Sequence, residues 1–292
     1  MRSGTDEGDG GPTWEPDPPE ELVPGWHAWE LLGRGHRCET WLAWSPERWC
    51  TGVVKLARPH QVDHPRARRS LGREARALRH HPHPALPTLF VDGSRAPVPH
   101  LVQQYVDGPA LDELVEEEGV LGPMPTALLG LHLLGALVSL HGRGIVHLDL
   151  KPDNVMVDEG RPVLVDFGSS RAIDGRRARD EPIGTPGYVA PSLEGGGRPA
   201  VTHDVFGAGA VLAEAMTGLR PDQQSPTPTG RWPLEALPDD PVVAAVRRML
   251  DADDDARPTV AEALTLLAAA LPDGHEPWPT GLTPGVRTAA RR

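Results

Sequence analysis

The chain has 292 residues, a formal net charge of −12 and 39% apolar residues. This length suits one large domain or two smaller lobes, and the apolar content is sufficient for a hydrophobic core. The acidic balance argues against nucleic acid as the main partner, and the two cysteines, which do not form a CxxC motif, indicate neither a disulfide framework nor a zinc site.

Residues 1–25 are rich in proline and glycine and carry seven acids against a single arginine. A segment with so few apolar residues buries too little surface to fold, so we expect a disordered lead-in with no signal peptide. The last residues, 273–292, are again rich in proline and glycine and predict a flexible tail.

Residues 26–102 are mostly strand-like, with one helix over 65–79. The helix places Leu71, Ala75 and Leu78 on one face and arginines around the rest. We expect that arginine-rich face to be solvated, with a docking role as the alternative.

The pattern becomes mainly helical from residue 112 onward. Helices are expected over 112–118, 126–141, 205–217, 242–250 and 260–271. The apolar run 127–140 is shorter than the roughly 20 residues that a bilayer requires, so it predicts a buried helix and no membrane span.

Two glycines, Gly33 and Gly35, follow Leu32 in the stretch LGRGHRC. They predict either a simple hairpin turn or a loop whose backbone N–H groups approach nucleotide phosphates. Lys55 lies on the next apolar strand, where a lone charge is costly unless it is paired. Glu74, on the predicted helix, is the candidate partner; a purely structural pair is the alternative.

A polar loop, His147 to Asn154, lies between two short apolar segments that predict strands, Ile145–Val146 and Val155–Val157. Polar loops on a rigid base commonly carry chemistry. Asp149 and Asn154 could be simple turn formers, but the sequence DFG follows twelve residues after Asn154.

In their order along nearly the whole chain, these pieces resemble the signature of protein kinases, and in particular the bacterial eukaryotic-like serine/threonine kinases. The resemblance rests on GVVK, EARAL, LVQQYVDGPAL, HLDLKPDN, DFG, GTPGYVAPS, DVFGAG and ARP. It implies an α+β, two-lobed fold with a small β-rich N-lobe (about 26–102) that contains one main helix. A hinge (about 103–108) and a larger, mainly α-helical C-lobe (about 109–272) would follow.

The resemblance also implies roles for individual residues. Asp149 would accept the proton of the substrate hydroxyl and Lys151 would steady the transferred phosphoryl group, while Thr185 would face the substrate. Asn154 and Asp166 would supply oxygen ligands to Mg²⁺. The nucleotide site would comprise Leu32, Gly33, Gly35, Val53, Lys55, Glu74, Gln103 as gatekeeper, the backbone of Gln104 and Val106, Asn154 and Asp166.

The function that we expect is ATP- and Mg²⁺-dependent phosphorylation of Ser and Thr hydroxyls on proteins, in the cytoplasm. The alternatives are a nucleotide-binding pseudokinase that works as a scaffold and a small-molecule phosphotransferase with the same fold. We expect the input signal to come from solution or from a partner protein. The sequence indicates no particular oligomeric state.

Some residues depart from the family pattern. Cys38 replaces the third glycine of the loop, Val53 replaces a small residue above the expected adenine site, and Ser192 replaces the glutamate that normally ends APE. We therefore expect Arg257 to lack its usual partner unless Glu194 reaches it.

Leu148 replaces the arginine before the catalytic aspartate. Because leucine cannot bind a phosphate, we predict activity without phosphorylation of the loop from residue 169 to 185. The alternative is that Leu148 is only a packing substitution and that phosphates on the loop bind its own arginines.

Overall fold

The computed structural model describes residues 11–79, 83–175, 183–222, 225 and 229–272. The chain divides into two compact units: an N-terminal unit of Met1–Pro82 and Pro87–Tyr105, and a C-terminal unit of His83–Leu86 and Val106–Arg292. The change of unit after Tyr105 falls inside the segment expected to be the hinge. The short segment His83–Leu86, which the sequence placed in the N-lobe, belongs instead to the C-terminal unit.

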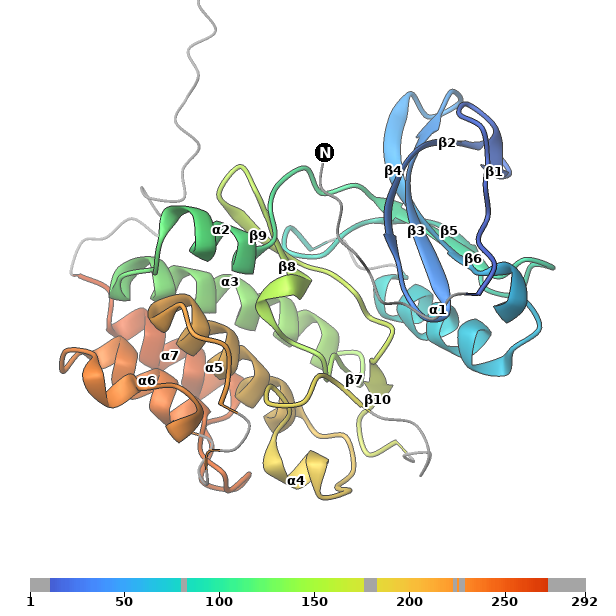
Figure 1. The fold of residues 1–292 in the computed structure, drawn as a ribbon. Helices are drawn as coiled ribbons and strands as arrows, with labels where there is room; N and C mark the ends of the chain where they lie inside the picture. Colours follow the sequence, from blue (N-terminus) through green and yellow to red (C-terminus); the bar gives the residue numbers. More distant parts are fainter. Residues whose placement is uncertain (1–10, 80–82, 176–182, 223–224, 226–228, 273–292) are drawn as a thin grey trace, which may run out of the picture. The chain divides into compact units, whose positions relative to one another are not determined.

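The N-terminal unit is built on a six-stranded antiparallel sheet with the order β1-β2-β3-β4-β6-β5, and Figure 1 shows that this sheet is strongly curled. Its strands are β1 (Glu21–Val23), β2 (Trp26–Arg34), β3 (Cys38–Ser45), β4 (Cys50–Ala57), β5 (Leu89–Gly93) and β6 (His100–Gln104). The strand-rich character expected for residues 26–102 is thus confirmed.

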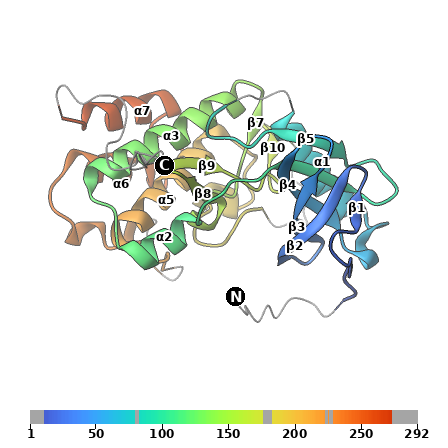
Figure 2. The same cartoon turned by 90° about the horizontal axis from the view of Figure 1, so that it is seen from above.

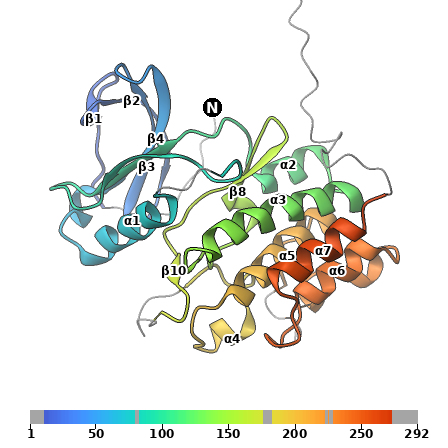
Figure 3. The ribbon, with the colours of Figure 1, turned by 180° about the vertical axis from the view of Figure 1, so that it is seen from behind.

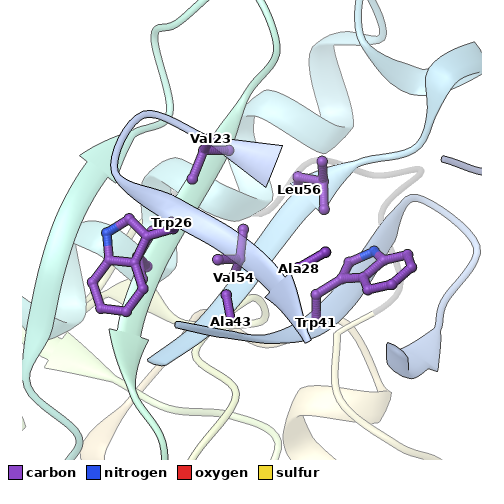
Figure 4. Close-up of a cluster of buried hydrophobic side chains, with 8 residues drawn as sticks. Val23, Trp26, Ala28, Trp41, Ala43, Val54 and Leu56 are labelled. Carbon is purple, nitrogen blue, oxygen red and sulfur yellow. The ribbon is translucent and has the colours of Figure 1, made fainter. Parts of the chain in front are cut away.

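An apolar cluster fills the inside of the curled sheet. Because side chains alternate between the two faces of a strand, Trp26 and Ala28 of β2 and Trp41 and Ala43 of β3 point to the same interior (Figure 4). A Cβ at Gly52 would lie 2.5 Å from the ring of Trp26, so the absence of a side chain there lets the indole pack against β4.

The lead-in is ordered over part of its length, so the expectation of disorder through residue 25 is wrong there. The backbone N–H of Trp14 donates to Oε1 of the buried Glu39 (3.0 Å), and its indole N–H donates to the carbonyl of Ala57 (2.8 Å). The segment 21–23 then forms β1. Isolated apolar residues anchor this stretch, and composition alone did not reveal them; residues 1–10 lie outside the described residues.

The helix predicted over 65–79 is α1 (Pro65–Leu78), which follows a short 3₁₀ turn, η1 (Pro59–Gln61). Proline at the first position removes an N–H that has no partner in a helix. The helix packs against β4, β5 and β6 (Figure 2). Its arginine face is only partly solvated, because Arg68 donates to the carbonyls of Ser94 and Ala96.

The C-terminal unit is mainly helical, as expected. Its α-helices are α2 (Leu111–Glu118), α3 (Pro123–His141), α4 (Pro191–Glu194), α5 (Val201–Thr217), α6 (Pro241–Met249) and α7 (Val260–Ala269). Figure 3 shows α3, α5, α6 and α7 packed side by side. The short helix α4 was not predicted, and neither were the 3₁₀ turns η2 (Pro152–Asn154), η3 (Thr229–Arg231) and η4 (Leu234–Ala236).

The helix α3 contains the apolar run 127–140 and lies in the core. Among the described residues it is the one helix that is long and apolar enough to cross a membrane, but more than half of its apolar window is buried in the protein. A Cβ at Gly130 would lie 2.5 Å from Leu267, so this glycine allows α7 to approach closely. The prediction of a buried helix is confirmed.

Two small two-stranded sheets position the polar loops of this unit. The strand β7 (Ile145–Val146) pairs with β10 (Arg171–Ala172), and β8 (Val155–Asp158) pairs with β9 (Arg161–Leu164). The loop 147–154 therefore leads from the β7–β10 sheet to the β8–β9 sheet, and the loop 165–170 leads back. The two strands predicted around the polar loop are both present.

Candidate active site

In the N-terminal unit, Lys55 and Glu74 form the ion pair that the sequence predicted. Lys55 projects from β4 and Glu74 from α1, and Nζ lies 2.7 Å from Oε1. The side chains are 15% and 3% exposed, respectively, so the pair is largely shielded from water. Salt therefore screens this pair less than it would screen an ion pair on the surface.

The glycine loop forms the hairpin turn between β2 and β3. The N–H of Gly35 donates to the carbonyl of Cys38 (2.9 Å), and Arg58 donates to the carbonyl of Gly35 (3.4 Å). Leu32 is exposed, and a Cβ at Gly33 would meet nothing within 4 Å. The predicted hairpin turn is therefore present, and no side chain blocks the approach of a ligand to the backbone at Gly33.

The residues expected around adenine lie on β4, on β6 and just beyond it. Val53 pairs in register with Gln103, and both are buried. The amide oxygen of Gln103 has no hydrogen-bond partner among the described residues. The N–H of Gln104 donates to the carbonyl of Thr88 (2.8 Å). Val106 is buried in the C-terminal unit.

In the C-terminal unit, Asp149, Asn154 and Thr185 come together. The hydroxyl of Thr185 donates to Oδ1 of Asp149 (2.7 Å), although the two residues are 36 positions apart. The amide nitrogen of Asn154 donates to the backbone carbonyl of Asp149 (2.8 Å). Thr185 thus orients the carboxylate of Asp149, and Asn154 fixes the backbone of the same residue. Because the amide nitrogen of Asn154 is used in this way, its amide oxygen is the atom that can bind a cation.

His147 joins this loop to the DFG turn. The N–H of Asp149 donates to Nδ1 of His147 (3.2 Å), so Nδ1 is unprotonated and Nε2 carries the hydrogen that faces the carbonyl of Val165 (3.2 Å). Its ring also meets the edge of the buried Phe167, at 4.9 Å between centroids. Asp166 lies between these contacts with a φ of +60°, an uncommon conformation for a residue other than glycine.

Asp204, at the start of α5, supports the loop from within the core. Its Oδ2 accepts from the N–H of His147 and its Oδ1 from the N–H of Leu148, both at 2.8 Å. The imidazole of His141 also lies 2.8 Å from Oδ2. Burial alone would raise the pKa of Asp204, but the contacts with His141 and His147 keep that pKa below its ordinary value. The sequence marked Asp204 only as the start of a helix, and its distance from the loop along the chain concealed this role.

Leu148 packs into an apolar cluster. Its φ of +68° is held by the hydrogen bond to Asp204, and its buried side chain belongs to one apolar cluster with Val146, Ile183 and Val189. Lys151 lies 3.9 Å from Asp153, a loose contact that leaves it on the loop surface. The loop residues 176–182, which carry most of the charges weighed in the sequence, lie outside the described residues.

The segment 184–192, which the sequence predicted to face the substrate, is held at further points that the sequence did not reveal. The hydroxyl of Tyr188 donates to Oε2 of Glu214 on α5 (2.6 Å), and Arg231 donates to the carbonyl of Gly187 (2.8 Å). Burial raises the pKa of Glu214 to about 7, against the opposing effect of the Tyr188 hydrogen bond.

Arg257 lacks its usual partner, as expected, because residue 192 is a serine. Glu194 does not reach it, because its carboxylate lies 3.4 Å from Arg231. Arg257 instead pairs with Asp254, at 2.8 Å between Nη1 and Oδ1. This partner lies three residues away in the turn between α6 and α7, where the sequence pattern gave no reason to look.

Two other features bear on the chemistry. Among the described residues no three His, Cys, Asp or Glu side chains gather as a metal cluster; Mg²⁺, however, is commonly held by one or two protein oxygens together with substrate phosphates. An apolar groove of about 710 Å³ on the sheet is lined by Trp29, Trp44 and their neighbours. None of the predicted site residues lines it.

A family model described as the protein kinase domain matches residues 26–266. The chain belongs to the protein kinase family. This match spans both units and includes every site residue named from the sequence. The resemblance on which those residues were chosen is therefore confirmed, while their individual roles stay predictions.

Several bacterial kinases are similar to this kinase domain. The serine/threonine-protein kinase PkaA of Streptomyces coelicolor is 42% identical over 41% of the chain, and serine/threonine-protein kinase C of Synechocystis is 33% identical over 66%. PknB of Mycolicibacterium smegmatis is 28% identical over 93%. The matched regions make up 23%, 39% and 47% of these relatives, so the chain spans less than half of their length.

Proposed function

We propose that the protein is an ATP-dependent serine/threonine protein kinase. The observation that carries the proposal is the hydrogen bond between Thr185 and Asp149, with Asn154 bonded to the carbonyl of the same aspartate. A carboxylate fixed in this way is suited to accept the proton of a hydroxyl group. The names of the bacterial relatives, which are serine/threonine-protein kinases, support the same activity.

Phosphoryl transfer requires in-line positioning of the reactants and stabilisation of charge, with little covalent work by the protein. In our proposal Asp149 is the general base, and Lys151 neutralises charge on the transferred group. Thr185 orients the base and borders the acceptor site. When bound, Mg²⁺ supplies electrostatic stabilisation of the ATP phosphates, and oxygens of Asn154 and Asp166 would hold it.

We propose a nucleotide contact for each residue that the sequence assigned to ATP. Lys55, steadied by Glu74, would contact its phosphates, and the glycine turn around Gly33 and Gly35 would cover them. Leu32 and Val53 offer apolar surface for adenine. The side chain of Gln103 would border the base, and the backbone of Gln104 and Val106 would bind its polar edge.

Serine or threonine is the preferred acceptor in this proposal. Thr185 lies against Asp149 and borders a shallow acceptor site, in which a short substrate side chain brings its hydroxyl close to the base. A tyrosine hydroxyl lies farther from its own backbone and would overshoot the base. The natural substrate is therefore proposed to be a protein with exposed Ser or Thr. We also propose a cytoplasmic location, which is favoured because Cys38 and Cys50 do not form a disulfide.

The test is transfer of label from γ-labelled ATP, with Mg²⁺, to a generic basic protein, followed by phosphoamino-acid analysis. We expect phosphoserine and phosphothreonine. Mainly phosphotyrosine would contradict the assigned acceptor. Binding of ATP without any transfer would favour a pseudokinase, and transfer only to small hydroxyl compounds would favour a small-molecule phosphotransferase.

A further inference from the structure

A polar network at the end of the substrate-facing segment has no role in the proposed chemistry. It contains Ser192 on α4, His203 on α5, and Asp254 and Arg257 in the turn that precedes α7. Nε2 of His203 lies 3.0 Å from Oγ of Ser192 and 3.2 Å from Oδ2 of Asp254. Oδ1 of Asp254 lies 2.8 Å from Nη1 of Arg257.

The hydrogen positions in this network follow from a single backbone contact. The N–H of Ala200 donates to Nδ1 of His203 (3.1 Å), so the hydrogen of a neutral imidazole is on Nε2, where it faces both Ser192 and Asp254. Burial lowers the pKa of His203 and outweighs the opposing effect of Asp254, which favours that neutral form. The single hydrogen on Nε2 is therefore shared between Oγ of Ser192 and Oδ2 of Asp254.

Arg257 anchors the other end of the network. Its side chain is fully buried, and its guanidinium donates to the carbonyls of Asp251 (3.1 Å from Nε and 2.7 Å from Nη2) and Thr202 (2.8 Å). It also lies over the ring of Phe206 at 5.2 Å. A buried cation requires a carboxylate partner, and Asp254 is the one that the structure provides.

The segment that ends at Ser192 carries the proposed acceptor site. It is fixed at Thr185 by Asp149, at Tyr188 by Glu214 and at Ser192 by His203. Loss of the contact between Ser192 and His203 would release the end of the segment, and Thr185 would then no longer be held in one position. Misplacement by about 1 Å in such a position can lower a rate about a hundredfold.

We propose that His203 and Asp254 are positioning residues for the substrate-facing segment: Asp254 neutralises Arg257, and His203 links that pair to Ser192, so that residues 184–192 keep one arrangement. This inference rests on the proposed kinase function and deepens it. In this proposal, the carboxylate of Asp254 takes the place of the one that a glutamate at residue 192 would provide.

The geometry yields a rescue experiment. Asp254→Ala removes the carboxylate, and Ser192→Glu brings a second carboxylate beside Asp254. We expect each single variant to lower kcat towards the basic protein about tenfold, with the Kd for Mg²⁺–ATP within about twofold of wild type. The double variant, which again has one carboxylate beside Arg257, should recover to within about threefold of wild-type kcat.

Controls separate this role from a general loss of stability. Asp255→Ala, an exposed carboxylate in the same turn, should leave kcat unchanged. All rates are measured well below the unfolding temperature of each variant. If Asp254→Ala does not fold, Ser192→Ala, which removes only the hydroxyl, should still lower kcat severalfold.

A readout that needs no activity distinguishes the two proposals. Backbone hydrogen exchange in residues 184–192 should speed up in Asp254→Ala and return towards wild type in the double variant, even in a chain that transfers no phosphate. Absence of transfer by wild type would therefore refute the kinase function alone. Unchanged exchange in Asp254→Ala, or a double variant no better than the worse single variant, would overturn the positioning role.

Discussion

The two units hold their polar site residues in different ways. In the N-terminal unit one ion pair, Lys55–Glu74, joins two neighbouring elements across 19 positions of sequence. In the C-terminal unit, Asp204 reaches 56 positions back to the N–H of Leu148, and His203 reaches 51 positions forward to Asp254. The first arrangement needs only a strand and a helix to pack, whereas the second exists only when several helices are assembled. We therefore expect substitutions in the second to affect folding more.

Removal of Asp204 should have the largest effect on stability. Asp204→Ala leaves the buried N–H groups of His147 and Leu148 without acceptors, and we expect the free energy of unfolding to fall by about 3–5 kcal/mol. The measurement is urea denaturation at 25 °C. As a control, Asp149→Asn, which leaves the hydrogen bonds to Asp204 intact, should change the free energy of unfolding by less than about 1 kcal/mol. If the two substitutions lower the free energy of unfolding equally, Asp204 is no more important for folding than Asp149 is, and the comparison fails.

Glu214 should make the C-terminal unit sensitive to pH. Its pKa in the folded protein is raised from an ordinary 4.5 to about 7, so the folded state holds a proton that the unfolded state releases. Between about pH 4.5 and 7 stability should therefore fall as pH rises, by up to roughly 3 kcal/mol from this group. Below that window the contribution is constant.

The test compares wild type with Glu214→Gln, which keeps an acceptor for Tyr188 but cannot ionise. Denaturation midpoints of the two proteins should be similar at pH 5, and the variant should be the more stable at pH 8. Parallel stability curves over this range would show that Glu214 ionises normally in the folded protein.

In the N-terminal unit, Glu74→Gln should weaken nucleotide binding more than folding. Without the carboxylate, the ammonium of Lys55 loses its fixed position, and a charge-assisted hydrogen bond is worth about 1.5–3 kcal/mol. This corresponds to a rise of about ten- to a hundredfold in the Kd for Mg²⁺–ATP, measured by calorimetry. Arg76→Gln on the exposed face of the same helix is the matched control. If both variants bind alike, the pair is only structural.

The smallest effect is expected at the loop after the DFG turn. Leu148 shares a buried apolar cluster with Ile183 and Val189, so that part of the loop is held by packing that needs no phosphate. Phosphatase-treated protein with Ser169→Ala and Ser170→Ala should keep its initial rate within about twofold, an effect too small for a phosphate-dependent switch. A collapse of the rate with ATP binding intact would identify a phosphorylation switch and refute this interpretation of Leu148.

The sequence predicted the elements well where hydrophobic periodicity was long. The helices at 111–118, 123–141 and 201–217 begin one to four residues earlier than expected. In α3 the reason is proline, which usually interrupts a helix but is tolerated at its first position. Motif spacing also selected Lys55, Asp149 and Asn154, whose roles stay predictions. Each lies in a segment whose local pattern is distinctive.

The remaining contacts were not predictable from spacing. Asp204, Glu214 and Asp254 look like ordinary helix or turn acids in the sequence, and their partners lie on elements whose packing no local pattern specifies. The order of Trp14 in the lead-in escaped prediction for the same reason, since its partner Glu39 lies on a strand 25 positions away. Such residues become visible only once burial and hydrogen-bond partners are known.

The central claim is that Asp149 acts on the acceptor hydroxyl and not on ATP, and a single-turnover assay tests it most directly. Asp149→Asn should transfer the γ-phosphoryl group to the basic protein about 10²–10⁴ times more slowly than wild type. Mg²⁺–ATP at a hundredfold excess over Kd should still stabilise it by about 2.7 kcal/mol. Glu159→Gln, exposed beyond the same loop, should match wild type. Transfer by Asp149→Asn at the wild-type rate would contradict the account.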